Sequence, residues 1–169
     1  MSGALVMTPI IPAKFNEAAF WEEIASEVQK VTKEIKKDFE GTVKTWKTKV
    51  VFEDLIEVGP DAVTIYVGTD NEIYGWVDKG TRPHRIEPKG NYPLAWRSGY
   101  TGPKTKPGSL KSVNRGKATG PYVFAKGVNH PGTKARGFSE MIAKKWERIL
   151  PKRMQKALDR AAKASGHGM

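Results

Sequence analysis

Two histidines are the residues of this chain whose type and surroundings come closest to a catalytic or metal site. His84 and His130 each lie among turn-forming residues, and Asp78 or Glu87 could supply a third ligand or an acid–base partner if the fold joins them. The chain has no cysteine and carries none of the HExxH, CxxC, Walker or GxSxG motifs. We therefore expect no metal or catalytic role for the pair, and expect each imidazole to hydrogen-bond to backbone and hold its turn.

The residues around the two histidines have the chemistry of shaped connections. Gly80 can take a positive φ, and Arg82 is pushed into an extended conformation by the following Pro83. Pro131-Gly132 suits the central pair of a type II turn. These residue types predict fixed backbone geometry at two corners of the fold.

A long segment between residues 97 and 120 combines flexibility with positive charge. It holds seven glycines and prolines, no acidic residue and few apolar ones, so it cannot bury enough surface to order itself. As a hairpin, each arm of about 12 residues could extend on the order of 40 Å. Its candidate contacts to DNA or to a partner protein are Arg97, Lys104, Lys106, Lys111, Arg115 and Lys117.

Charge is divided unevenly along the chain. Residues 1–80 hold 9 Lys and Arg against 14 Asp and Glu, whereas residues 81–169 hold 20 against 4. This asymmetry predicts a basic surface for a polyanion, a head-to-tail interface between copies, or two halves whose charges interleave within one fold. The sequence has no apolar stretch long enough to span a membrane and no secretory-signal pattern, so we expect no membrane partner.

The first half of the chain predicts one helix and then a meander. Apolar residues recur every three or four positions over residues 15–39, with Asn16 as the N-cap and Gly41 as the stop. Period-two alternation then predicts antiparallel strands, with Gly75 marking a bulge in the last of them: 46–52, 63–67 and 73–77.

The second half predicts two more strand pieces, 94–96 and 122–125, and a closing helix over 138–163 that Pro151 should kink or restart. One face of this helix is cationic, which indicates a solvated face, a phosphate contact, or pairing with the acidic first helix. Its members are Lys144, Lys145, Arg148, Lys152, Arg153, Lys156, Arg160 and Lys163.

These elements predict an α+β fold. We expect a mostly antiparallel, twisted sheet of four to five strands packed against an N-terminal and a C-terminal helix. A single domain is expected over residues 15–164, with the long basic loop at 97–120 inserted in it. Residues 1–14 are expected to form an N-terminal arm and residues 165–169 a frayed tail.

The two turn strings together resemble the tail-component family of lambda-like bacteriophages, which includes neck, tail-completion and head-to-tail joining proteins. The family pattern is an N-terminal helix, a small meander, a tyrosine-containing strand running into a Gly-Thr-x-Pro-His turn, and a His-Pro-Gly-Thr turn before a closing helix. The matching residues are Tyr74, Gly80, Thr81, Arg82, Pro83, His84, Ile86, Pro88, His130, Pro131, Gly132, Thr133 and Phe138.

The resemblance implies a structural virion protein with no enzymatic activity and no cofactor. Such proteins are thought to act as homo-oligomeric rings, here a hexamer or dodecamer, around the DNA channel of the phage neck or tail tube. Implied partners are other copies of the chain, connector, tail-terminator or tail-tube proteins, and packaged DNA through non-specific contacts. The expected location is the virion, after synthesis and assembly in the host cytoplasm.

The alternative is a small basic nucleic-acid-binding protein, such as a nuclease that uses His84 and His130. Sequence-independent attraction of the basic loop to phosphates needs only charge and reach. Base stacking on aromatic residues is a weaker possibility, because several of these residues fall where core positions are needed. The aromatic residues concerned are Tyr74, Trp76, Trp96, Tyr100 and Tyr122.

Overall fold

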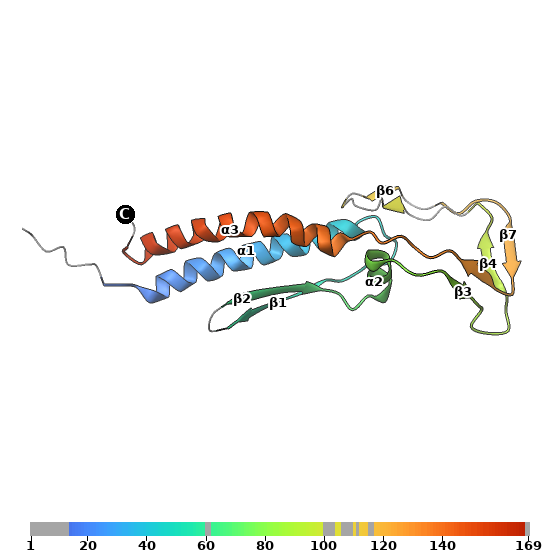
Figure 1. Cartoon of the computed structure of the whole chain (residues 1–169), viewed down its shortest axis with the longest axis horizontal. Helices are drawn as coiled ribbons and strands as arrows, with labels where there is room; N and C mark the ends of the chain where they lie inside the picture. Colours follow the sequence, from blue (N-terminus) through green and yellow to red (C-terminus); the bar gives the residue numbers. More distant parts are fainter. Residues whose placement is uncertain are drawn as a thin grey trace, which may run out of the picture. The chain divides into compact units, whose positions relative to one another are not determined.

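The computed structural model describes residues 14–59, 62–99, 104–105, 110, 112–114 and 117–167. The predicted α+β class is confirmed, with three helices and a set of short antiparallel strands (Figure 1). In chain order the elements are α1 (Glu17–Val43), β1 (Glu53–Val58), β2 (Val63–Gly68), α2 (Glu72–Lys79), β3 (His84–Ile86), β4 (Leu94–Arg97), β5 (Lys104–Thr105), β6 (Ser112–Asn114), β7 (Tyr122–Ala125), β8 (Val128–His130) and α3 (Phe138–Ala164).

The strands pair two by two, so the predicted single sheet of four to five strands is wrong. Among the described residues the pairs are β1–β2, β3–β8, β4–β7 and β5–β6, all antiparallel. Turn-forming residues such as Pro83, Pro88 and Gly90 interrupt the chain after only a few extended residues. Each ribbon therefore has two edges, and each lacks the third strand that usually makes a small sheet stable.

Helix α2 replaces the strand expected at residues 73–77. The Asn71 side chain caps it, because Oδ1 accepts a hydrogen bond from the Tyr74 backbone N–H at 3.0 Å. Tyr74 and Asp78 are both buried, which is the spacing of one helical face. The short run of alternating residues suits either element, and the cap decides for helix. Gly75 lies inside this helix rather than at a bulge.

The strand expected at residues 46–52 is also displaced. Residues 44–52 are irregular, with Val50 and Phe52 buried, and strand β1 begins only at Glu53. Strand β2 falls where it was predicted, as do β4 and β7.

Helix α1 confirms the N-terminal prediction but runs past its expected stop at Gly41 to Val43. Asn16 is the N-cap, since its Oδ1 accepts from the Ala19 N–H at 3.2 Å. The buried stripe recurs every three or four residues, whereas Trp21 is 56% exposed and is not a core residue. The buried apolar members of the stripe are Ile24, Val28, Val31, Phe39 and Val43.

The described residues group into two compact units. The first unit combines Met1–Val31 with Arg148–Met169, and the second is Thr32–Glu147. Helices α1 and α3 each contribute one end to the first unit, and α3 continues through Pro151 without interruption. In the described part of the chain, no helix has both the length and the apolar character needed to cross a membrane.

In the first unit, acidic residues of α1 pair with cations of α3. Glu27 is 4% exposed and contacts the Arg153 guanidinium at 2.5 Å and that of Arg160 at 2.9 Å, while Arg160 also pairs with Glu23. In the second unit, Lys145 pairs with Asp38 of α1 at 2.6 Å. These pairs confirm, for three of its cations, that the basic face of the closing helix meets the acidic helix of the same chain.

The end of α3 is closed by a capping motif where we expected a frayed tail. The His167 N–H donates to the Ala162 carbonyl at 2.8 Å and the Gly166 N–H to the Lys163 carbonyl at 3.1 Å, with Gly166 at φ 88°. This is the Schellman arrangement. The Ser165 carbonyl in turn accepts from the Asn16 N–H at 3.2 Å, so the C-terminal cap meets the start of α1. Residues 168–169 and the N-terminal arm up to residue 13 lie outside the described residues.

We expect Glu27→Gln to lower the free energy of unfolding by about 1–2 kcal/mol at neutral pH, since it leaves two guanidinium groups without their carboxylate. Burial by itself would raise the pKa of Glu27, but Arg153 and Arg160 outweigh it and lower the pKa below the ordinary 4.5. The stability from a lowered carboxyl pKa is complete above that value and is lost as pH falls through the folded pKa.

Urea unfolding followed by circular dichroism at about pH 7 and about pH 3 measures this difference. The advantage of the wild-type protein over Glu27→Gln should be smaller at the lower pH. Glu22→Gln, at an exposed position of the same helix, is the matched control and should change little at either pH. An equal deficit of Glu27→Gln at both pH values would contradict the assignment.

Candidate functional site: interlocked turns and exposed ribbon faces

The two predicted turn strings meet and form one structure. Thr81 and Thr133 exchange both backbone hydrogen bonds, with N···O distances of 2.9 and 3.1 Å. The Thr133 N–H also donates to the Thr81 hydroxyl at 3.0 Å. This bridge links residues 52 positions apart in the sequence and continues into the β3–β8 ribbon. The corners therefore brace each other.

Two glycines allow this close approach. Gly80 has φ 77° and Gly132 has φ 85°, as the sequence predicted for both turns. A Cβ added at Gly80 would lie 2.6 Å from the Thr133 carbonyl oxygen, and one added at Gly132 would lie within 2.5 Å of the Thr81 carbonyl oxygen. Each glycine therefore makes room for the backbone of the opposite turn.

The two histidines face each other across β3 and β8, as the sequence allowed. His84 and His130 are register partners, and their ring centroids are 5.1 Å apart. His84 Nδ1 lies 2.9 Å from the Arg82 carbonyl oxygen and so donates to it, whereas His130 Nδ1 accepts from the Gly132 N–H at 3.1 Å. The expectation that each imidazole holds its own turn is confirmed. Neither Asp78 nor Glu87 forms a metal-binding group with them, and the described residues contain no group of three or more such side chains.

Asp78 has a structural task that the sequence did not reveal. Its buried carboxylate accepts from the Ser139 N–H at 3.2 Å and from the Ser139 hydroxyl at 2.7 Å, which caps the start of α3 from a distant segment. Its backbone carbonyl accepts from the N–H groups of Arg136 and Gly137, both at 3.0 Å. The second turn is thereby fixed to α2. Asp78 and Ser139 are 61 residues apart, so no local sequence pattern indicates this contact.

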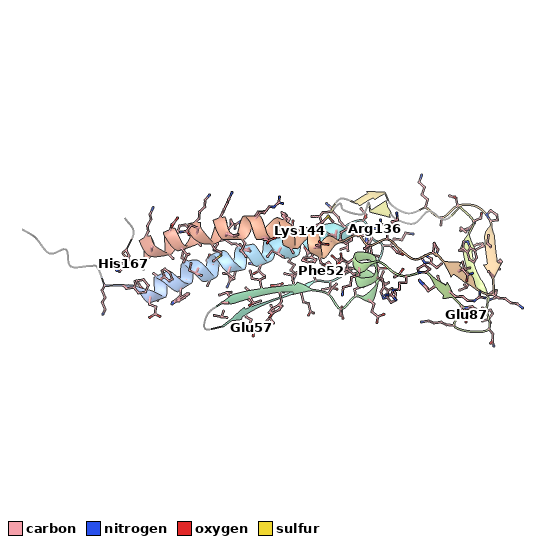
Figure 2. The ribbon with its side chains drawn as sticks, viewed as in Figure 1. Phe52, Glu57, Glu87, Arg136, Lys144 and His167 are labelled. Carbon is pink, nitrogen blue, oxygen red and sulfur yellow. The ribbon has the colours of Figure 1, made fainter. Side chains whose placement is uncertain are left out.

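An aromatic cluster surrounds Tyr74 of α2, the helix that ends at the first turn. Tyr74 is 5% exposed, and its ring centroid lies 5.1 Å from that of Phe52 and 6.0 Å from that of Phe138. The rings of Phe39 and Trp46 also lie against Tyr74. Burial raises the pKa of Tyr74 to about 12, so its hydroxyl stays protonated at neutral pH. Tyr74 is therefore a core residue and not a stacking platform. Figure 2 labels Phe52 in this cluster.

The basic segment is described only in part. Its ends are held close together, because the Ser98 N–H donates to the Pro121 carbonyl at 2.9 Å and the Gly99 N–H to the Thr119 carbonyl at 2.8 Å. The short β5–β6 pairing continues this hairpin. Lys104 lies in β5 and Lys117 is exposed. Three of the predicted contact residues lie outside the described residues: Lys106, Lys111 and Arg115.

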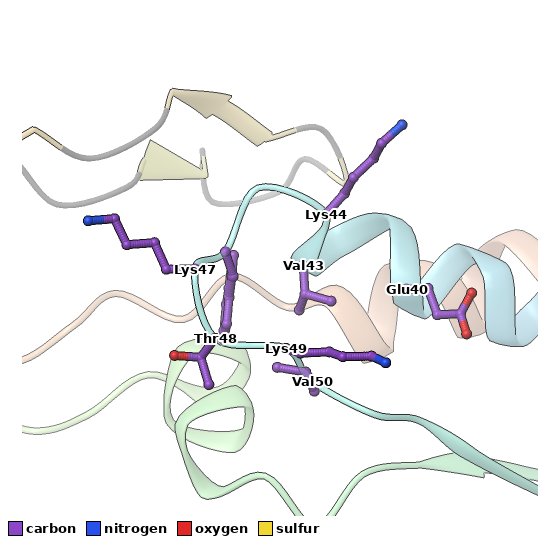
Figure 3. Close-up of a pocket in the computed structure, with 8 residues that line it drawn as sticks. Glu40, Val43, Lys44, Lys47, Thr48, Lys49 and Val50 are labelled. Carbon is purple, nitrogen blue, oxygen red and sulfur yellow. The ribbon is translucent and has the colours of Figure 1, made fainter.

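One cavity of about 320 Å³ lies at the end of α1, between Glu40 and Val50. It contains three lysines, Lys44, Lys47 and Lys49, whose ammonium ends point in different directions (Figure 3). An anion site needs donors that converge on one point. This cavity therefore supports neither an anion site nor a catalytic centre.

The outer face of the β1–β2 ribbon is apolar and acidic. Leu55 and Tyr66 are register partners on this face and are 62% and 51% exposed. Glu53 and Glu57 flank Leu55 on the same face, because alternate residues of a strand share a face. On the opposite face Asp54 pairs with Lys36 of α1 at 2.6 Å, so α1 lies on that side of the ribbon near Asp54, whereas Val58 and Val63 at the turn end are exposed. We name the outer side, with Glu53, Leu55, Glu57, Thr64 and Tyr66, the acidic ribbon face.

The outer face of the β4–β7 ribbon is aromatic and basic. Tyr122 and Phe124 are 58% and 64% exposed, and their ring centroids are 6.3 Å apart. The Arg97 guanidinium lies 4.2 Å from the Tyr122 ring centroid and donates to the Gly120 carbonyl at 3.0 Å. Ala95 completes this face as the partner of Phe124, and we name the four residues the basic ribbon face.

The sequence prediction named Arg97 and Tyr122 as candidate contacts but not the other residues of these two faces. A usable signal was present at residues 55–58, where Leu55, Ile56 and Val58 place apolar side chains on both faces of one strand. A strand that is apolar on both faces usually has both faces covered. Comparison of the chain with family models, curated proteins and solved structures gives no match.

Proposed function

We propose that this chain is a structural protein of a bacteriophage neck or tail-completion ring, joining head connector to tail around the DNA channel. The observation that carries the proposal is the pair of two-stranded ribbons whose outer faces leave large apolar side chains in solvent. Isolated two-stranded ribbons are marginally stable in water, and clustered exposed apolar residues are typical of protein interfaces. Assembly would cover both faces.

The interlocked turns also support a structural role. Their chemistry-bearing residues, His84, His130 and Asp78, are engaged with backbone or with Ser139 and brace the corner. These turns contain most residues on which the resemblance to phage tail-component proteins rests. One departure is that Tyr74, expected in a strand, lies in α2. The observed bracing is consistent with turns that shape the subunit for assembly.

Deletion of the gene from its phage is expected to leave DNA-filled heads and separate tails that do not join, because the ring between them is missing. Electron microscopy of the lysate measures this, and a wild-type copy supplied in trans is the control that should restore joined particles. An antibody against the chain should label the head–tail junction. Normal infectious particles that lack the chain would contradict the proposal.

The protein and its phage also test the nucleic-acid alternative. A nuclease that uses the two histidines should cleave DNA, and His84→Ala should abolish cleavage while particle assembly stays normal. Under the structural proposal no cleavage is expected. Non-specific DNA contact through the basic segment would instead give binding that weakens steeply with salt.

A further inference from the structure

The two ribbon faces of the second unit carry opposite charge. Residues 53–68, which form β1, β2 and their turn, contain four acidic residues and no lysine or arginine. Residues 81–99 and 117–136, which contain β3, β4, β7 and β8, hold eight lysines and arginines against one acidic residue, Glu87. Each ribbon thus belongs to a segment with an excess of one charge, and the charged residues on the faces themselves are Glu53 and Glu57 on one and Arg97 on the other.

The faces also match in the chemistry of their centres. The acidic ribbon face presents the Leu55–Tyr66 pair between two carboxylates, with Glu57 toward the turn end of the ribbon (Figure 2). The basic ribbon face presents Tyr122 and Phe124, with Arg97 held against the Tyr122 ring. An apolar centre with a charged rim on both sides is the usual anatomy of a protein interface.

We propose that the acidic ribbon face of one copy docks on the basic ribbon face of a second copy, in a head-to-tail contact. This inference rests on the proposed ring function and specifies the surfaces that build the ring. In the contact, Leu55 and Tyr66 pack against Tyr122 and Phe124, and the carboxylates of Glu53 and Glu57 pair with Arg97. Both members of each charge pair leave water only in part, so charge sets orientation while the apolar pairs supply affinity.

The choice of a second copy over a nucleic acid follows from the pairing of faces. A polyanion would occupy the basic ribbon face and leave Leu55 and Tyr66 in solvent beside Glu53 and Glu57. Arg97 is moreover held between the Tyr122 ring and the Gly120 carbonyl, so it presents a fixed cation at an aromatic surface. A second copy covers both apolar centres with one type of contact.

The symmetry of the assembly follows from the two faces being different. A contact between unlike surfaces leaves one free face of each kind, and such heterologous contacts propagate until they close into a ring or extend as a filament. The five and four residues of the two faces are far fewer than the about 20–30 residues per partner of a stable dimer. Closure, which engages every copy twice, is therefore needed for a stable assembly.

Cysteine cross-linking tests the contact directly, because the chain contains no cysteine. Tyr66→Cys and Phe124→Cys place single thiols on the two faces at exposed positions. Under mild oxidation, a mixture of the two variants is expected to give a disulfide-linked dimer, whereas each variant alone should stay monomeric on a non-reducing gel. Trp21→Cys, at a similarly exposed aromatic position of α1, is the control that should not cross-link with Phe124→Cys.

Either single variant cross-linking to itself would overturn the head-to-tail arrangement, since that result requires a like-with-like contact. Failure of the mixture to cross-link would overturn the contact itself. A further outcome would also overturn the contact: the mixture stays monomeric, and Phe124→Ala abolishes binding of a fluorescent single-stranded oligonucleotide of about 20 nucleotides. The basic ribbon face would then be a nucleic-acid surface.

Charge reversal supplies a second measurement. Arg97→Glu is expected to weaken self-association at least tenfold in analytical ultracentrifugation, and mixing it with a Glu53→Lys/Glu57→Lys double variant should restore association. No loss with Arg97→Glu, or no recovery in the mixture, would overturn the pairing of these charges. The proposed function has its own test: it is contradicted if purified particles lack the chain, whatever the cross-linking shows. If particles contain the chain but Tyr66→Cys and Phe124→Cys do not cross-link in them, only the proposed contact is overturned.

Discussion

Phe138→Ala is expected to lower the free energy of unfolding by about 3–5 kcal/mol, as is usual when a buried phenylalanine is truncated to alanine. Phe138 is completely buried at the first position of α3, and its ring stacks on that of Tyr74 at a centroid distance of 6.0 Å. The substitution leaves a cavity between α2 and the start of α3. The same cavity would loosen the Asp78–Ser139 cap on the adjacent residue.

Urea unfolding monitored by circular dichroism measures this loss, and Phe124→Ala is the matched control. Phe124 is 64% exposed, so its truncation should change the stability of the dilute monomer by less than about 0.5 kcal/mol. The two phenylalanines therefore separate core packing from the proposed interface. A loss below about 1 kcal/mol for Phe138→Ala would contradict the placement of this ring in the core.

Gly132→Ala is expected to lower the free energy of unfolding by about 3 kcal/mol or more. A non-glycine residue at φ 85° is strained by roughly 1–3 kcal/mol. The added Cβ would also meet the Thr81 carbonyl oxygen and lie 2.9 Å from the Arg82 carbonyl carbon, which are backbone atoms that cannot rotate away. To relieve the clash, the two turns must separate and the Thr81–Thr133 bridge must lengthen.

Gly75→Ala is the control for this effect. Gly75 lies within α2, its φ is not positive, and a Cβ there would meet nothing within 4 Å. Alanine should therefore leave stability unchanged or raise it by up to about 1 kcal/mol. Amide hydrogen exchange gives a local measurement, since the N–H groups of Thr81 and Thr133 should lose protection only in Gly132→Ala. Wild-type protection in that variant would contradict the interlocked geometry.

The features that the sequence determined are those that a few neighbouring residues decide. The period of apolar residues fixed the two long helices, Asn16 supplied the cap of α1, and the positive φ of Gly80 and Gly132 followed from their turn context. In each case the interaction spans no more than a few positions along the chain, so it can be inferred without knowing what lies nearby in space.

The tertiary structure decided the features that depend on contacts between segments far apart in the sequence. Residues 73–77 suit a strand or a helix; the Asn71 cap is a local signal for the helix, but burial of Tyr74 and Asp78 depends on distant segments. The pairing of β3 with β8 and the capping of α3 by Asp78 join residues more than 40 positions apart. The local sequence of a short strand suits several pairing partners equally well, and only long-range packing selects one of them. Which ribbon face is covered, and hence which one is free to bind, follows from that choice.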